Sequence, residues 1–464
     1  MSLSVDNANV VLKRVYENQN NLTAKLRGVS PTYARIRKKQ VPGGRTLNHS
    51  VQTGSAQSVS SNFKEAFDAA VNNTLGPHFS GLRFPWDEYH ASWSIQSKAI
   101  KQMPMKGPGS FINASRRLVT STEETVEKMR TLHMFSDRQG YIGKVTGYTT
   151  ASDRVIAGAD RDFGLEPTEA FYKFQLTDPS HITQFEKGLR FQMAASLTAS
   201  SVAKTTGADP TDLTFEVKHV SGDEKDPVLY ASIVSPGIAH PGRAVTTDFS
   251  NYYIFRVGDF ANKGTFLPGF KSWCPSTLAN TDSFFGLNRS EGKLNPVQRN
   301  NNLAGYYFDL TGAYSSSADD FKRFQKTIDR IIEAAGIAEQ RGASPDYYCV
   351  HPRLFRYLVT ELGQKVELEI KDDGLKVYKI HGGNGYISLY QDSYCPIDEV
   401  FGLNFNDWAF VSLGDFIDKF DHDGNVMRRV QGENLISGAV SSYATLICAN
   451  PNNFIRMKVP TVLT

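Results

Sequence analysis

Apolar residues recur every three or four positions along several stretches of the sequence, which is the spacing of one face of an α-helix. The clearest stretch is Phe111–Met134, where a thin apolar stripe is flanked by charged residues. At about 1.5 Å per residue, this helix would be roughly 35 Å long. A thin stripe predicts a helix that lies along a surface rather than inside a bundle. The same spacing predicts shorter helices at Val10–Leu26, Phe63–Val71, Thr183–Leu197, Ala318–Ala335 (ended by Gly336) and Pro352–Leu362.

Short runs of β-branched and aromatic residues, bounded by turn residues, predict strands between these helices. In Tyr89–Ile100, Trp93 and Ile95 fall on one face. Gly383-Asn384-Gly385 is interpreted as a hairpin turn, because a dinucleotide-binding loop needs a third glycine. Helices and strands together predict an α+β fold. Further strands are predicted at Phe215–Lys218, Val228–Ile233, Tyr252–Val257, Asp346–Val350, Tyr386–Tyr390, Trp408–Leu413 and Ala444–Cys448.

The region before the long helix is poor in residues that could form a core. From Val41 to Ser61 the sequence is dominated by Gly, Ser, Thr, Gln and Asn, with a turn signal at Pro42-Gly43-Gly44. Two extended segments with little apolar content cannot bury a core of their own. We therefore expect a long protruding loop that depends on contact with another molecule.

Charge is distributed unevenly along the chain. The 464 residues carry a net charge of only +3, with 40% apolar or aromatic and 21% charged residues, which excludes wholesale disorder. Residues 1–45 hold nine basic residues against Asp6 and Glu17, a net charge of +7, which leaves −4 on the other 419. Two interpretations of this basic arm are open: contact with a polyanion, or docking on an acidic face of its own or a neighbouring chain. Its candidate functional residues are Lys13, Arg14, Lys25, Arg27, Arg35, Arg37, Lys38 and Lys39.

Targeting and redox signals point to a reduced compartment. The first residues lack the basic and apolar blocks of a signal peptide, and the longest uncharged stretch, 434–455, is too polar to cross a membrane. The four cysteines lie far apart without a CxxC pair, so we expect buried free thiols and a cytosolic origin.

Catalytic and ligand-binding motifs fail on inspection. Gly264–Gly269 has the glycine spacing of a phosphate-binding loop, but Phe270 stands where a lysine is needed. Asp421 and Asp423 resemble the start of a calcium loop, but Val426 occupies the position that needs glycine. The ten histidines show no metal-binding spacing. We therefore expect no catalytic residues, no metal and no cofactor, and a protein that is not an enzyme.

The order of these elements resembles the major capsid proteins of tailed bacteriophages, whose fold is named after phage Hong Kong-ninety-seven and is shared by encapsulin shells. Phe111–Met134 resembles the spine helix of that fold, and Asp137–Gly147 resembles the glycine-punctuated segment that follows the spine. The closing strand, which commonly ends in an Asn-Pro turn, is similar to Tyr443–Pro451. The axial domain is similar to Ala318–Ala335, Tyr348–Pro352, Tyr386–Tyr390 and Trp408–Ser412.

This resemblance implies an α+β phage major capsid fold with an N-terminal arm (1–36), an extended loop (37–106), a peripheral domain (107–310, spine helix 111–134) and a mainly axial domain (311–464) to which the C-terminal strand returns. It implies a structural subunit that self-assembles into pentamers and hexamers of an icosahedral head enclosing double-stranded DNA. The implied partners are other copies of the chain, a scaffold protein, the portal protein, packaged DNA bound non-specifically and a possible cement protein, with no membrane. The implied location is the virion capsid, assembled in the cytoplasm of the host bacterium.

Two alternatives are open. The first is an encapsulin-like nanocompartment shell, whose partner would be a cargo enzyme instead of a genome. The second is a β-rich polysaccharide hydrolase, which would need two carboxylates about 5–10 Å apart in a cleft. Glu124 and Glu127 on the predicted long helix are interpreted as exposed helix acids rather than as such a pair.

Overall fold

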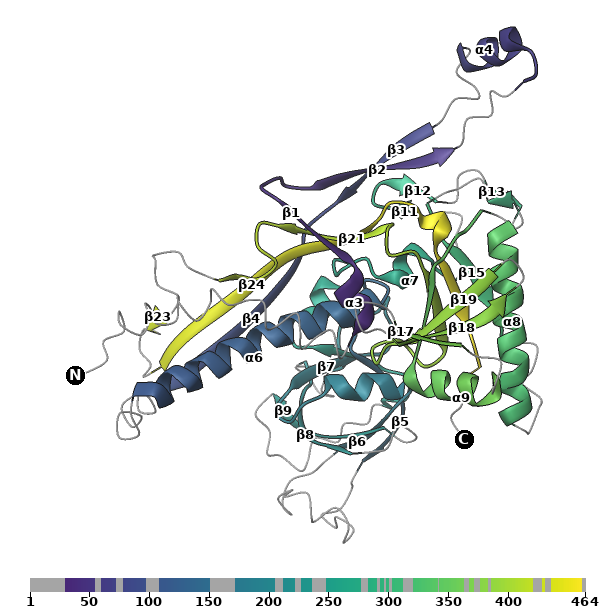
Figure 1. Cartoon of the computed structure of the whole chain (residues 1–464). Helices are drawn as coiled ribbons and strands as arrows, with labels where there is room; N and C mark the ends of the chain where they lie inside the picture. Colours follow the sequence, from purple (N-terminus) through teal and green to yellow (C-terminus); the bar gives the residue numbers. More distant parts are fainter. Residues whose placement is uncertain are drawn as a thin grey trace. The chain divides into compact units, whose positions relative to one another are not determined.

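The computed structural model describes residues 30–54, 60–71, 78–96, 108–150, 172–204, 212–221, 227–235, 248–276, 283–289, 293–295, 298–299, 303–311, 320–340, 342–362, 367–370, 376–382, 385–419, 428–429 and 435–460. They form a mixed α and β structure with more strand than helix (Figure 1). Two compact units are present. Unit 1 comprises 1–137, 267–394 and 400–459, and unit 2 comprises 138–266, 395–399 and 460–464. The predicted helix Val10–Leu26 and the calcium-like residues Asp421 and Asp423 lie outside the described residues.

The first sheet of unit 1 is built on the long strand β24 (Leu435–Cys448). Strand β4 (Asp87–Gln96) and then β21 (Trp408–Leu413) pair antiparallel with successive parts of β24, and β1 (Arg37–Val41) adds parallel to β21. Helix α6 (Pro108–Met134) packs along β4 and β24, which confirms the predicted long helix. Its stripe is buried at Val119, Val126, Met129 and Leu132. Short strands β22 (Asp418–Lys419) and β23 (Arg428–Arg429) complete this sheet.

Strand β24 begins nine residues before the strand predicted at Ala444–Cys448. Its first half contains Gly438, which argues against a strand by propensity. In the structure Gly438 pairs with Trp93, and a Cβ at Gly438 would collide with the Trp93 indole ring. The glycine therefore makes room for a large cross-strand neighbour.

The second sheet of unit 1 has seven strands in the order β15-β25-β20-β16-β19-β18-β17. Helices α8 (Asp320–Gln340) and α9 (Pro352–Leu362) contact each other and this sheet. The predicted strands at 346–350, 386–390 and helix 352–362 are confirmed, and Gly382 pairs with Gly385 in the predicted hairpin. The strands are β15 (Tyr306–Asp309), β16 (Tyr347–Val350), β17 (Glu367–Ile370), β18 (Lys376–Gly382), β19 (Gly385–Gln391), β20 (Glu399–Leu403) and β25 (Ile455–Lys458).

Helix α8 does not end at Gly336, so that prediction is wrong. The helix continues to Gln340, and Gly342 follows with a φ of 89°. The amide of Ala343 donates to the Ala338 carbonyl, which satisfies a terminal carbonyl group of the helix. Gly336 is not in the left-handed region, whereas Gly342 is, and this conformation is what ends a helix with glycine.

Unit 2 contains a closed six-stranded β-barrel in the order β10-β5-β6-β9-β8-β7. Closure pairs every strand on both sides, so the barrel has no open edge. Its segment ends near its beginning, where the Arg138 Nε donates to the Phe266 carbonyl at 3.1 Å. The strands are β5 (Gly143–Thr150), β6 (Tyr172–Leu176), β7 (Arg190–Ala194), β8 (Thr214–Ser221), β9 (Val228–Ser235) and β10 (Tyr253–Arg256).

The helix predicted at Thr183–Leu197 is wrong. The structure has a 3₁₀ helix, η3 (Pro179–Gln184), followed by β7. Between them Gly188 has a φ of 91°, which a continuous helix does not allow. Phe191 and Met193 then alternate inward, both fully buried, as a barrel strand requires.

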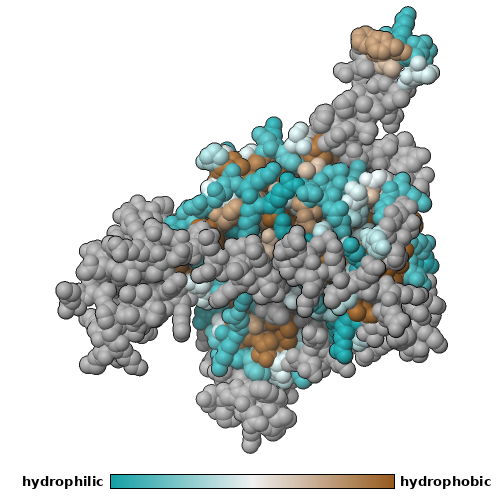
Figure 2. All heavy atoms as spheres, in the orientation of Figure 1, coloured by the Kyte–Doolittle hydropathy of each residue, from teal (hydrophilic) through white to brown (hydrophobic). Residues whose placement is uncertain are grey.

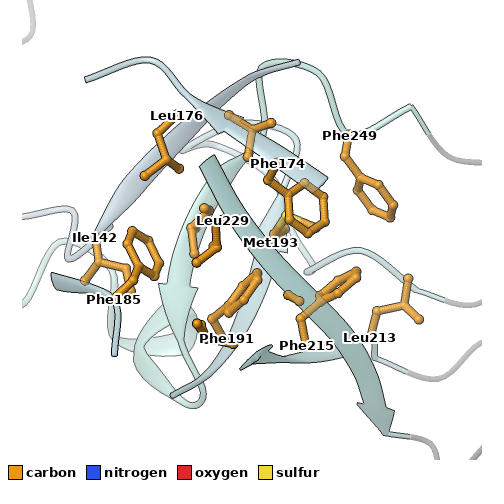
Figure 3. Packing of buried hydrophobic residues seen from close by; sticks show 14 residues of the cluster. Ile142, Phe174, Leu176, Phe185, Phe191, Met193, Leu213, Phe215, Leu229 and Phe249 are labelled. Atoms are coloured by element: carbon orange, nitrogen blue, oxygen red, sulfur yellow. The ribbon is translucent and has the colours of Figure 1, made fainter. Parts of the chain in front are cut away.

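The barrel core is aromatic and tightly packed (Figure 3). Phe215 is completely buried, and its ring centroid lies 5.4–5.6 Å from those of Phe174, Phe191 and Phe249. Such ring pairs add about 0.5–1.5 kcal/mol each beyond the burial of area. Side chains therefore fill this barrel.

All four cysteines are buried and none is in a disulfide, as predicted.

The remaining elements are short. The connecting elements are α3 (Pro31–Arg35), α7 (Phe270–Trp273), η4 (Asp259–Asn262), η6 (Pro451–Asn453), β11 (Ser283–Phe284), β12 (Leu287–Asn288), β13 (Lys293–Asn295) and β14 (Gln298–Arg299).

Gly269 provides a stability test in unit 1. A Cβ at this position would collide with the backbone carbonyl oxygens of His133, Met134 and Ser136 at the end of α6. Backbone cannot rotate away, so Gly269→Ala should lower the free energy of unfolding by about 3 kcal/mol. Gly81→Ala is the matched control, because a Cβ there meets nothing within 4 Å. Equal denaturation midpoints for the two variants would refute this close packing.

Candidate functional site

Two features are candidates for a functional surface. The first is the basic segment that leads into β1, and the second is the hairpin of β2 (Leu47–Gly54) and β3 (His78–Phe84). Four of the eight predicted arm residues, Lys13, Arg14, Lys25 and Arg27, lie outside the described residues. The other four are Arg35, at the end of α3, and Arg37, Lys38 and Lys39 in β1.

Arg35 and Arg37 pack against their own chain. The Arg35 guanidinium carbon lies 4.9 Å from the centroid of the Tyr347 ring and 5.6 Å from that of Phe405. Arg37 is exposed, and its Nη2 donates to the backbone carbonyl and the side-chain Oδ1 of Asn406 at 2.7 and 2.9 Å. These contacts are to aromatic rings and to oxygens of Asn406.

Lys38 lies near a cluster formed by Tyr33, Glu127 and Arg130. Its ammonium nitrogen lies 4.6 Å from the centroid of the buried Tyr33 ring. On α6, the Arg130 Nη1 donates to the Tyr33 hydroxyl at 3.4 Å, and Nη2 donates to the Phe416 carbonyl. Burial raises the pKa of Tyr33 to about 12, with Arg130 opposing this shift. The hydroxyl therefore stays protonated at neutral pH.

Glu127 belongs to the same cluster, and its expected exposure is wrong. Its side chain is buried on α6. Burial raises the pKa of the Glu127 carboxyl, while the charges of Lys38 and Arg130 lower it. The buried Glu127 on α6 is thus near the positive charges of Lys38 in β1 and Arg130 on α6.

The second feature is the two-stranded sheet of β2 (Leu47–Gly54) and β3 (His78–Phe84), which carries α4 (Phe63–Val71) in its connection (Figure 1). Phe84, at the end of β3, is fully buried among aromatic rings of unit 1. Its ring centroid lies 4.2 Å from that of Phe285 and 5.8 Å from that of Trp273. The hairpin is thus anchored at Phe84.

Helix α4 occupies the predicted range, but its two phenylalanines are not covered. Phe63 is 83% exposed and Phe67 is 57% exposed, and their rings stack with centroids 6.1 Å apart. Figure 2, in the orientation of Figure 1, shows hydrophobic atoms beside hydrophilic atoms at the place of α4. The two phenylalanines are the most exposed large hydrophobic residues in the described part of the chain. A nine-residue helix is marginal in water without a partner for its apolar face.

Carboxyl groups with a raised pKa occur in both units. Burial raises the pKa of Asp259 in unit 2 to about 6, against the influence of Arg256. In unit 1, burial also raises the pKa of Glu123 on α6 and of Asp346 before β16. Each shift has desolvation as its main cause, which packing alone produces. Among the residues that the structure describes, no group of three or more His, Cys, Asp or Glu could hold a metal ion.

The sequence predicted helix α4 but not the exposure of Phe63 and Phe67. The available signal was their i, i+4 spacing in a segment flanked by polar residues. The sequence also gave no indication of Asp392, a fully buried carboxyl that contacts α3. No residue pattern near Asp392 distinguishes it from a surface turn.

No protein-family model matches the chain, and no curated protein sequence matches it. A capsid chain of cyanophage A-1(L) aligns with 92% of this chain and 91% of its own, with 10% identity and a TM-score of 0.41. The structure of Mycobacterium phage Adephagia aligns with 93% of this chain and 90% of its own, with 8% identity and a TM-score of 0.37. The encapsulin complex of Synechococcus elongatus aligns with 34% of this chain and 54% of its own, with 10% identity and a TM-score of 0.23.

Two of these three matches are to phage structures. They extend over nearly the whole chain, whereas the encapsulin match extends over a third. Identities near 10% and TM-scores below 0.5 establish no function, which has to be argued from the geometry of the chain itself.

Proposed function

We propose that the chain is a structural, non-catalytic subunit that self-assembles into pentamers and hexamers of an icosahedral phage head enclosing double-stranded DNA. The observation that carries this proposal is the exposed Phe63–Phe67 pair on a hairpin anchored at Phe84. Large apolar side chains that are exposed to water are typical of a contact with another molecule.

The size of this contact favours assembly over binding of a single partner. One face of a nine-residue helix is far smaller than the roughly 1,200 Å² of a stable interface. It is therefore effective only as one of several contacts between the same two molecules. Repeated heterologous contacts that close into rings provide this multiplicity, and other copies of the chain are the simplest source of them.

In finer terms, we propose the architecture implied by the resemblance: an N-terminal arm, an extended loop containing β2, α4 and β3, a peripheral domain with α6 as its spine helix, and an axial domain with the seven-stranded sheet. The proposed partners are a scaffold protein during assembly, the portal protein, non-specifically bound DNA and a cement protein. The proposed location is the virion capsid, after assembly in the host cytoplasm. None of the described helices is both long and apolar enough to cross a membrane.

Electron microscopy of the full-length protein, expressed with and without its scaffold protein, tests this function. We expect closed shells with five-fold and six-fold clusters of subunits. Shells filled with a protein cargo instead of nucleic acid would favour the encapsulin alternative. Monomers that stay unassembled under all these conditions and cleave a polysaccharide would refute the capsid proposal.

A further inference from the structure

The residues directly before β1 are inserted into the seven-stranded sheet of the same unit. Asp392 follows β19, at the carboxyl ends of the parallel neighbours β16 and β19. Its Oδ2 accepts hydrogen bonds from the Ser30 hydroxyl at 2.8 Å and from the Thr32 amide at 3.2 Å. Its Oδ1 accepts from the Tyr394 amide at 3.0 Å. One carboxyl group thus joins positions 360 residues apart in the sequence.

Further contacts seat the same segment. The Thr32 hydroxyl lies 2.9 Å from the Tyr390 hydroxyl and 3.5 Å from the Cys349 Sγ. The Tyr33 ring packs on Phe410 with centroids 5.1 Å apart. Ser30 and Thr32 are fully buried. Ser30–Arg35 therefore fits its seat as a closely packed unit.

The chemistry of this seat depends on the charge of Asp392. Its hydrogen-bond donors on Ser30, Thr32 and Tyr394 are neutral groups. Burial raises the pKa of Asp392, and its hydrogen bonds only partly oppose that shift. If Ser30–Arg35 moved out of the seat, Asp392 would become hydrated and would have the ordinary Asp pKa of about 3.9.

Other ionisable groups also lie at the seat. Burial raises the pKa of Tyr390 on β19 well above 10, and burial also raises the pKa of Tyr394. The Cys349 thiol on β16 faces Thr32, and Arg35 on α3 packs over aromatic rings. His351, which directly follows β16, and Glu127, which acts on Tyr33 from α6, also lie near the segment, so the Asp392→Asn variant is needed to assign a pH dependence to Asp392.

We propose that Ser30–Arg35 is a plug, held at the carboxyl ends of β16 and β19 by Asp392, which undocks as one unit when the pH rises. The docked state has the higher affinity for the Asp392 proton. Docking is therefore most favoured at pH values below the ordinary pKa of an Asp side chain. The equilibrium constant for docking falls by up to tenfold per pH unit between pH 3.9, about the ordinary pKa of Asp, and the raised pKa of the docked state. Above that raised pKa the constant no longer changes with pH. This switch lies within one subunit and does not depend on shell assembly.

Hydrogen exchange by mass spectrometry on the unassembled full-length protein tests the plug between pH 4 and 8. The reporters are the amides of Thr32, Tyr33, Ala34 and Ile36, all hydrogen-bonded in the docked state. After correction for the intrinsic exchange rate, their protection should fall as the pH rises, while the amides of β21 stay protected. In Asp392→Asn, which keeps an oxygen acceptor but cannot ionise, plug protection should no longer vary with pH.

Ser30→Ala provides a second variant, because it removes one donor to Asp392. The Ser30 hydroxyl also accepts from the Tyr33 amide, so this variant is followed at Thr32, Ala34 and Ile36 only. It should lower plug protection about tenfold or more at neutral pH. Ser94→Ala is the matched control, since Ser94 is exposed on β4. Plug protection that is independent of pH in the unchanged protein, or that always changes together with β21, would overturn the proposal. If Asp392→Asn unfolds β21 as well, Ser30→Ala decides the outcome: wild-type plug protection in that variant also overturns it.

Discussion

Replacing both Phe63 and Phe67 by serine is expected to weaken shell assembly while the subunit still folds. Both side chains are mostly exposed, so the free energy of unfolding should change by less than about 0.5 kcal/mol. Covering each phenylalanine in a subunit contact contributes about 1.5–3 kcal/mol. Loss of at least about 3 kcal/mol per contact should raise the concentration needed for assembly about 100-fold. Light scattering and electron microscopy across a concentration series measure this shift.

The matched control is the double variant Lys64→Ser and Asp68→Ser on the same helix. Both side chains are exposed, and the pair of changes leaves the net charge unaltered. This control should assemble at the wild-type concentration. If Phe63→Ser/Phe67→Ser assembles at that concentration too, the exposed pair is not an assembly contact, and the observation that carries the proposed function is lost.

Local pattern was sufficient for elements whose partners are generic. The predicted helix Phe63–Val71 and strand Trp408–Leu413 match the structure at both ends. Helix α9 likewise begins at Pro352, because proline is favoured in the first turn, where its missing amide has no cost. In these segments the hydrophobic period and the terminating residues agree, so any apolar neighbour produces the same element.

Prediction failed where a distant residue determines the local structure. By propensity, Gly438 argues against a strand. Its small size is required by Trp93, which lies on another strand. The apolar residues around Gly188 fit a helix by spacing alone, but closure of the barrel requires β7 there. Barrel closure depends on pairing β10 with both β5 and β7, which no local pattern encodes.

The candidate functional residues were harder to predict than the fold. Basic residues are visible in the sequence, but the rings and amide oxygens that receive Arg35 and Arg37 lie more than 300 residues away. Asp392 has the same difficulty, because only tertiary structure brings Ser30 to it. Exposure is also a tertiary property: the spacing of Phe63 and Phe67 predicts an apolar face, and only the fold shows that the chain leaves it uncovered.

The aromatic core of the barrel leads to the largest expected effect on stability. Phe215→Ala should destabilise unit 2 by about 3–5 kcal/mol, because it leaves a cavity and removes several ring contacts. The barrel has no edge strand at which pairing could be lost gradually, so unfolding should be cooperative across its six strands. Hydrogen exchange should show a common loss of protection in β5–β10, with the seven-stranded sheet of unit 1 unchanged.

Two controls separate cavity formation from a general effect of substitution in this unit. Phe215→Leu keeps most of the apolar volume and should cost clearly less than Phe215→Ala. Lys173→Ala changes an exposed side chain on the outer face of β6 and should alter stability by less than about 0.5 kcal/mol. If Phe215→Ala lowers protection equally in both units, the barrel is not an independent cooperative unit. If it lowers protection in neither, Phe215 does not hold the barrel core together.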